Sequence, residues 1–147
     1  IVLLDSAVLP APEVWAGVQP IMKALRTPQY RDVVGRFLAD VFFLPTDDPE
    51  RKRWCIDTML STPPHVLASA FEEIFAWDSA AAIARCKVPT LYVASTNPRG
   101  DVARFEEMCP QLVHGRVVGS GHFVELEVPD QVNAMIGRFL HTGLARQ

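Results

Sequence analysis

Residues 88–94 read Val88-Pro89-Thr90-Leu91-Tyr92-Val93-Ala94, an apolar run rich in strand-forming residues, and Val113–Val118 is a second such run. Asp101–Cys109, between them, is predicted to form a short helix that stops before a proline. Pro129–Leu140 follows with apolar residues at helical spacing, which predicts a longer helix. The order strand, helix, strand, helix predicts βαβ units and therefore a parallel sheet.

The rest of the chain adds one more strand and a long helical segment. Ile1–Leu4 is a short, continuous apolar run, which is typical of a buried parallel strand. From Pro12 to Trp77 the apolar residues recur at helical spacing, which predicts four helices with no strand between them. We therefore expect about three parallel strands with a helical excursion between the first and the second. The predicted segments are 1–11 (core strand and exit loop), 12–85 (helices) and 86–147 (α/β core).

Composition excludes several classes of protein. Fourteen basic and seventeen acidic residues give a net charge of −3, and no basic stripe stands out, so we expect no nucleic-acid partner. The longest apolar runs are far too short to span a bilayer, so we expect no membrane partner. The three cysteines have no metal-ligand or disulfide spacing, which favours reduced thiols and a cytoplasmic location.

A histidine follows the last predicted strand. The segment Gly119-Ser120-Gly121-His122-Phe123 has glycines that let the backbone turn tightly and place the imidazole at the carboxyl end of the strand. Open α/β sheets bind their ligands at this edge, and an imidazole can take up and return a proton near neutral pH. We interpret His122 as a candidate acid–base residue, with a solvated or capping role as the alternative from position alone.

The residues around this histidine resemble a known superfamily. Gly121-His122-Phe123, then Glu127-Val128-Pro129 and a helix to Leu140, resemble the C-terminal end of the α/β-hydrolases. Val88–Val93 resembles their penultimate strand, and Ile1–Ser6 resembles the strand that follows the helix after the nucleophile. The resemblance covers the whole chain and implies an α/β protein.

The implied fold class is the C-terminal half of an α/β-hydrolase fold, with parallel strands and a helical lid inserted at 12–85. Because the chain begins inside a strand, we expect it to be a fragment of a longer protein. The family carries its nucleophile on a GxSxG elbow, and none of the six serines here lies in that motif. The resemblance therefore implies a nucleophile on a missing N-terminal half or on a second chain, with no cofactor and no metal.

The acid of the implied catalytic triad has two candidates. The family usually places a carboxylate just after the penultimate strand, but residues 94–98 are not acidic, and Asp101 is the first carboxylate beyond them. A branch resembling haloalkane dehalogenases places the acid instead at the position of Asp5. Capping a helix is the structural alternative for Asp101, and bonding to neighbouring backbone amides is the alternative for Asp5. We favour Asp5, because it leaves a strand at the edge that presents His122.

Three functions follow from these observations. The first is hydrolysis of a small apolar ester or similar acyl compound through a nucleophile–His–acid triad, with a small-molecule substrate. The second is a hydrolase similar to haloalkane dehalogenases, in which an aspartate replaces the serine of the elbow. The third is a non-catalytic binding or scaffold module with the same fold.

Overall fold

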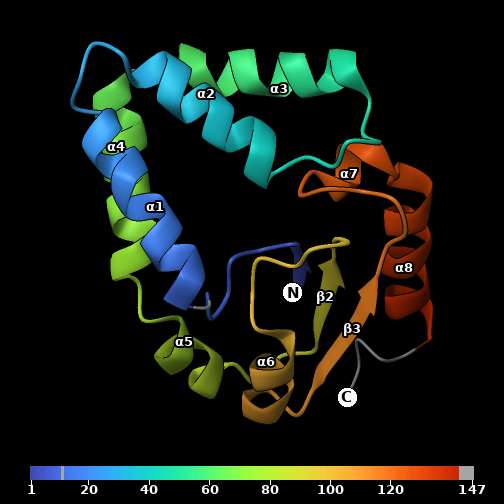
Figure 1. Cartoon of the computed structure of the whole chain (residues 1–147). Coiled ribbons are helices and arrows are strands. Elements are labelled where there is room, and N and C mark those ends of the chain that lie inside the picture. Colours follow the sequence, from blue (N-terminus) through green and yellow to red (C-terminus); the bar gives the residue numbers. More distant parts are fainter. Residues whose placement is uncertain (11, 143–147) are drawn as a thin grey trace. The chain divides into compact units, whose positions relative to one another are not determined.

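The computed structural model describes residues 1–10 and 12–142 (Figure 1). Residue 11, in the predicted exit loop, and residues 143–147, in the predicted α/β core, lie outside the described residues.

The chain divides into two compact units. One contains the sheet and comprises Ile1–Ala11 with Ser79–Gln147, and the other is helical and comprises Pro12–Asp78. Helix α5 (Ser79–Arg85) falls in the sheet unit, whereas its residues were predicted to belong to the helical segment 12–85. The Leu9 amide donates to the Ser79 hydroxyl at 3.3 Å, so the first residues of α5 are bonded to the exit loop of the first strand.

The sheet has three parallel strands, as predicted. They are β1 (Val2–Leu4), β2 (Thr90–Ala94) and β3 (Leu112–Arg116), in the spatial order β1-β2-β3. Both pairs are parallel, with Leu3 opposite Tyr92 in the first. Their carboxyl ends therefore lie at one edge of the sheet.

β3 ends earlier than the predicted strand Val113–Val118. The Val117 amide still donates to a β2 carbonyl at 2.9 Å. The backbone of Val118, however, is bonded on both sides by the side chain of Gln131: its amide donates to Oε1 at 2.9 Å, and its carbonyl accepts from Nε2 at 3.1 Å. A side chain thus replaces the neighbouring strand as hydrogen-bond partner, and the chain turns there.

Each face of the sheet is covered by helices, and β2 alternates between the two faces. Leu91 and Val93 pack with residues of α7 (Val124–Glu127) and α8 (Pro129–His141). The intervening Tyr92 packs on the other face, with residues of α5 and α6 (Val102–Met108). Figure 1 shows α6 and α8 on opposite sides of the sheet. All five residues of β2 are buried, which explains why this strand reads as a continuous apolar run.

The helical unit contains the four helices that the spacing predicted, α1 to α4. Its core includes Ile21, Leu25, Val34, Leu38 and Leu60. Asp48 caps α3 through an acceptor bond from the Arg51 amide at 2.8 Å, with a proline in the first turn. The helices are bounded as follows: α1 Pro12–Ala24, α2 Tyr30–Val41, α3 Pro49–Ser61 and α4 Pro64–Ala76.

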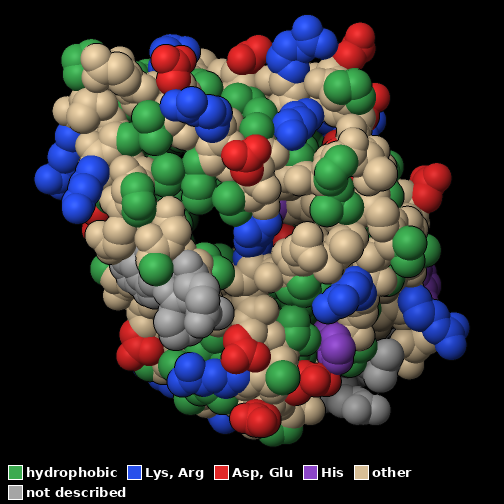
Figure 2. Space-filling view, in the orientation of Figure 1, with side chains coloured by type: hydrophobic (Ala, Val, Ile, Leu, Met, Phe, Trp, Pro, Cys, Tyr) green, Lys and Arg blue, Asp and Glu red, His purple; other side chains and the backbone are tan. Residues whose placement is uncertain are grey.

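Two further observations concern the apolar length of the helices and the charges on one face. In the part of the chain that the structure describes, no helix is long and apolar enough to cross a membrane. On the face shown in Figure 2, Lys and Arg side chains are interspersed with Asp and Glu side chains.

Candidate active site

The end of β1 places a carboxylate at the edge of the sheet. The Asp5 amide still donates to the Val93 carbonyl at 2.8 Å, so the main chain of Asp5 remains paired with β2. Its φ of 42° is left-handed, a conformation that aspartate tolerates better than most residues. The chain leaves the strand there, and the carboxylate is fully buried.

The loop after β3 brings the imidazole to the same edge. Gly119 turns the chain with a φ of 75°, which favours glycine. The Thr96 amide, just after β2, then donates to the Ser120 carbonyl at 3.1 Å. The Val124 amide donates to the His122 carbonyl at 3.0 Å. The backbone around His122 is therefore fixed by two hydrogen bonds, one from Thr96 to Ser120 and one from Val124 to His122 itself.

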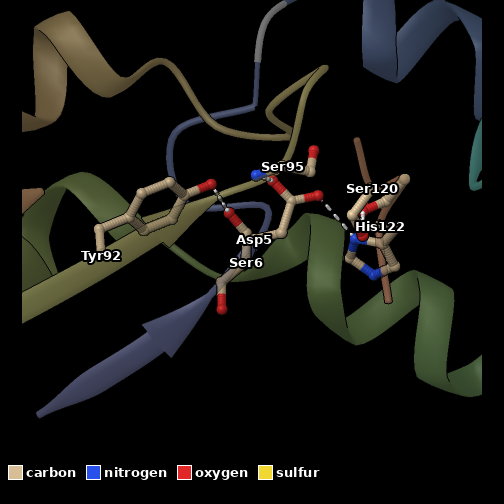
Figure 3. A network of polar contacts seen from close by, with 7 residues as sticks. Asp5, Ser6, Tyr92, Ser95, Ser120 and His122 are labelled. Atoms are coloured by element: carbon tan, nitrogen blue, oxygen red, sulfur yellow. Dashed lines mark hydrogen bonds and ion pairs between the residues drawn. The ribbon is translucent and has the colours of Figure 1, made fainter. Parts of the chain in front are cut away.

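Asp5 and His122 are in direct contact (Figure 3). The Nδ1 atom of His122 lies 2.9 Å from Oδ2 of Asp5, and the Ser95 amide donates to Oδ1 at 3.0 Å. An ionised carboxylate can only accept, so this bond puts the proton of the neutral imidazole on Nδ1. The His122 side chain is 26% exposed. A buried carboxylate thus orients a partly accessible imidazole.

A second set of contacts fixes the exit loop behind Asp5. The Tyr92 hydroxyl donates to the Ser6 carbonyl at 2.9 Å (Figure 3). Gly100 lies so close that an added Cβ would be 2.4 Å from the Val8 carbonyl oxygen. The Asp101 amide donates to the Leu9 carbonyl at 3.1 Å. The loop after β2 therefore packs tightly against the loop after β1.

Two further ionisable groups lie close to Asp5. Burial, with the negative charge of Asp5 adding to it, raises the pKa of Tyr92 above its ordinary value. Burial lowers the pKa of Arg99, an effect that the charge of Asp5 opposes. The carboxylate therefore has a neutral phenol and a guanidinium in its surroundings.

The structure distinguishes the two candidates for the acid by their hydrogen-bond partners. The Asp101 carboxylate accepts from the Arg104 amide at 3.0 Å and is the N-cap of α6. This is the structural role that its position allowed. Asp5 is the candidate that the structure brings to His122.

Sequence reasoning missed the residues that hold Asp5 in place. Tyr92 is a polar aromatic residue in a strand that is otherwise suited to full burial, and a buried phenol needs a hydrogen-bond partner. That requirement was the available signal, although it could not identify Ser6 as the partner. Nothing in the sequence indicated the hydrogen bond from the Ser95 amide to Asp5, since that bond depends only on the position of the backbone.

The helical unit carries a groove of its own, of about 440 Å³. Phe71 and Phe75, which stack with ring centroids 6.5 Å apart, line it beside an ion pair between Arg26 and Glu72 at 3.1 Å. Within residues 1–10 and 12–142, no group of three or more His, Cys, Asp or Glu side chains is arranged to hold a metal ion.

Comparisons with known proteins identify the fold. None of the protein-family models searched matches the sequence, and no curated protein sequence matches it. A thermophilic esterase from Thermogutta terrifontis, solved with malate bound, superposes with a TM-score of 0.77 at 18% identity. A hydrolase from Pseudomonas aeruginosa superposes with a TM-score of 0.71 at 18% identity.

These alignments cover 98% and 96% of this chain but only 56% and 55% of the two solved chains. The chain thus spans little more than half the length of its structural neighbours. The likeness confirms the predicted fold class, a parallel sheet with a helical segment inserted between its first and second strands.

Proposed function

We propose that this chain, which has the fold of the C-terminal half of an α/β-hydrolase, supplies the base and the acid of a hydrolytic triad. His122 is the base and Asp5 is the acid. The observation that carries the proposal is the 2.9 Å contact between His122 Nδ1 and the buried Asp5 carboxylate. The nucleophile comes from a segment outside this chain, since no serine here lies in a GxSxG motif.

The tautomer defines how the dyad would work. With the proton on Nδ1, the lone pair of the imidazole is on Nε2, which takes the proton from the nucleophile as it attacks an acyl carbon. The Asp5 carboxylate stabilises the imidazolium that forms. Nε2 then gives the proton to the leaving alkoxide, and the same nitrogen activates the water that releases the acyl group.

The substrate class that we propose is a small, largely apolar ester or a similar acyl compound. One of the two structural neighbours is an esterase, which supports this class. We propose that the helical unit, inserted between β1 and β2, is the lid of the enzyme.

A second candidate is hydrolysis of a carbon–halogen bond. The acid stands at the end of β1 and not just after β2, and this placement resembles the haloalkane-dehalogenase branch. In that reaction an aspartate on the elbow attacks the carbon that bears the halogen, the carbon–halogen bond breaks and halide leaves. His122 then activates the water that cleaves the covalent ester intermediate. The nucleophile decides between the two functions, because the dyad serves both.

The test is an assay of the parent enzyme, in which this chain is expressed with the segment that carries the nucleophile. We expect hydrolysis of p-nitrophenyl esters, and we expect His122→Ala to lower kcat by roughly a thousandfold or more. His114→Ala is the matched control, because His114 pairs with Glu106 at 2.9 Å and lies partly exposed. Halide release without ester turnover would support the second candidate, and no turnover of either substrate would leave the non-catalytic module.

A further inference from the structure

The groove of the helical unit lies between α1 and α4, and we call it the α1–α4 groove. It has a volume of about 440 Å³, and the residues that line it come from two stretches of the chain, 19–26 and 71–76. Both stretches belong to the helical unit. A cavity of this size, with apolar and aromatic walls and a few polar groups, is the usual form of a small-molecule site.

The apolar wall of the α1–α4 groove is a strip of aromatic surface along α4. Phe71 and Phe75 are one helical turn apart, and their rings stack with centroids 6.5 Å apart and an interplanar angle of 11°. Met22 of α1 lines the groove with them. All three residues are only half-buried, and none of the described residues of α4 is fully buried. A ligand in the groove would therefore remove apolar surface from water, which favours binding.

The α1 side of the groove carries two cations, of which one is already paired. Arg26 forms an ion pair with Glu72 at 3.1 Å. Lys23, one turn before Arg26, is exposed and has no hydrogen bond or ion pair with any residue that the structure describes. The charged residues that line the groove, Lys23, Arg26 and Glu72, leave it with one net positive charge, whereas the whole chain carries −3. The groove therefore attracts an anion, and Lys23 is the group available to bind it.

A second groove of the helical unit shares this ion pair. Arg26 and Glu72 line both grooves, so the ion pair stands between the two. Among the described residues that line the second groove there is neither a phenylalanine nor a lysine. The combination of an aromatic strip with an available cation therefore distinguishes the α1–α4 groove from its neighbour.

We propose that the α1–α4 groove binds a medium-chain carboxylate, with the alkyl chain along Phe71 and Phe75 and the carboxylate beside Lys23. Two nearly parallel rings in line along a helix form an extended apolar strip, which fits a linear chain. The lysine ammonium is a compact point charge, which suits a single carboxylate. The guanidinium of Arg26 would suit a bidentate anion, but Glu72 already holds it.

This binding site is independent of the proposed hydrolysis. Its lining residues belong to the helical unit, whereas His122 and Asp5 belong to the sheet unit. Its test measures binding and not turnover, so the failure of one proposal leaves the other standing.

The four methionines of the chain allow the groove to be observed directly. Met22 lines the groove, whereas Met59, Met108 and Met135 pack against three different hydrophobic clusters. The experiment labels the methionine methyl groups isotopically and follows their NMR signals while decanoate is titrated below its critical micelle concentration. We expect a saturable shift of the Met22 signal with smaller changes at the other three. Decyltrimethylammonium, which has the same chain and the opposite charge, should bind at least about threefold more weakly.

Matched substitutions test the contribution of charge. Lys23→Gln should weaken decanoate binding by about two- to fivefold, the range for exposed ion pairs, and Lys87→Gln, the same change in the sheet unit, should leave the Kd unchanged. Glu72→Gln releases Arg26 and should tighten binding by a similar factor. Glu73→Gln, at an exposed position that does not line the groove, should have a smaller effect.

The apolar contribution is tested by Phe75→Ala, which should weaken the binding of both amphiphiles by roughly tenfold because one ring of the strip is lost. The wild-type titration needs no variant and decides the question even where a variant does not fold. A Met22 signal that does not shift, a parallel shift of all four methyl signals, or equal affinities for decanoate and decyltrimethylammonium would overturn the proposal.

Discussion

Asp5 combines three properties that are individually unfavourable for a surface carboxylate but useful for an orienting acid. It is fully buried, its backbone is left-handed, and it bonds to groups from two other segments. A left-handed non-glycine residue costs on the order of 1–3 kcal/mol and persists only where its surroundings hold it. Here the surroundings are the Tyr92 hydroxyl on the Ser6 carbonyl and the close approach of Gly100.

The phenol of Tyr92 makes stability depend on alkaline pH. Its pKa is raised in the folded chain, so its contribution is fully present below the unfolded value of about 10 and is lost as the pH rises beyond it. Above that pH, unfolding releases a proton from Tyr92, and the free energy of unfolding should fall by up to roughly 1.4 kcal/mol per pH unit through this group. Urea denaturation at a series of alkaline pH values measures this loss.

The matched variants are Tyr92→Phe and Tyr30→Phe, since these are the two tyrosines of the chain. Tyr92→Phe should remove this part of the pH dependence. Tyr30 is half-buried at the start of α2, and Tyr30→Phe should retain the pH dependence. An identical alkaline slope in all three proteins would show that the Tyr92 phenol ionises as easily in the folded chain as in the unfolded one.

Gly100 offers a second test at the scale of one residue. In Gly100→Ala the new methyl group would lie 2.4 Å from the Val8 carbonyl oxygen and 3.2 Å from that of Ser6, so the loop that carries Asp5 must move. We expect a loss of about 1–3 kcal/mol in unfolding free energy, as for other overpacked sites. Chemical denaturation of the variant measures it.

Gly137→Ala is the control, because nothing lies within 4 Å of its added Cβ and the residue is inside α8. Alanine there should raise stability by about 0.5–1 kcal/mol through helix propensity. If Gly100→Ala were as stable as Gly137→Ala, the tight packing between the two loops would be disproved.

At the scale of elements, α8 holds the histidine loop through one side chain. The Gln131 side chain accepts a hydrogen bond from the Val118 amide and donates one to the Val118 carbonyl. Gln131→Glu keeps the acceptor and removes the donor, which should cost about 0.5–1.5 kcal/mol. Denaturant midpoints of the variant and the wild type measure this, and equal midpoints with equal slopes would show that the Val118 carbonyl does not depend on Gln131.

The sequence predicted the elements better than their ends. β2 was recognisable because every one of its residues is buried, and the four helices of 12–77 were recognisable from their apolar stripes. The four-residue helix α7 was not predicted, and α5 was included in the helical segment 12–85 without being predicted as a helix of its own, since neither is long enough to show a period. β3 was predicted two residues too long at its end because Val117 and Val118 continue its apolar run, and the Gln131 bonds that end the strand come from a distant helix.

The sequence predicted which side chains form the candidate site, but not which residues hold those side chains in place. His122 and Asp5 could both be placed at the carboxyl edge, because parallel strands present their ends together. Asp101 could not be excluded, since a helix cap and a catalytic acid use the same side chain. The Tyr92–Ser6 bond joins residues 86 positions apart, and no local pattern contains such information.

At the scale of the whole molecule, the described strands leave both edge strands of the sheet, β1 and β3, unpaired on one side. β1 pairs with β2, and within the described residues it has no strand on its other side. The Asp5 amide points to β2, so by alternation the Leu4 amide points away from it. An open edge of this kind favours pairing with another segment, and we expect the segment that carries the nucleophile to pair there.

Amide hydrogen exchange tests this pairing. The Leu4 amide should exchange at least about a hundredfold more slowly in the parent protein than in this chain alone, because a hydrogen-bonded amide exchanges only on opening. The Asp5 amide, already bonded to β2, is the internal reference. Equal protection of the Leu4 amide in both proteins would exclude a partner strand beside β1.

The central claim, that Asp5 and not Asp101 orients His122, is tested most directly by the kcat of Asp5→Asn and Asp101→Asn in the parent enzyme. Both changes keep the shape of the side chain, and asparagine tolerates the left-handed backbone of one site and caps helices at the other. We expect Asp5→Asn to lower kcat on p-nitrophenyl esters by roughly ten-thousandfold, as replacing the orienting acid does in other triads. We expect the kcat of Asp101→Asn to stay within about twofold of the wild-type value, since an asparagine cap is equivalent to an aspartate cap. A larger loss for Asp101→Asn, or an unchanged kcat for Asp5→Asn, would contradict the account.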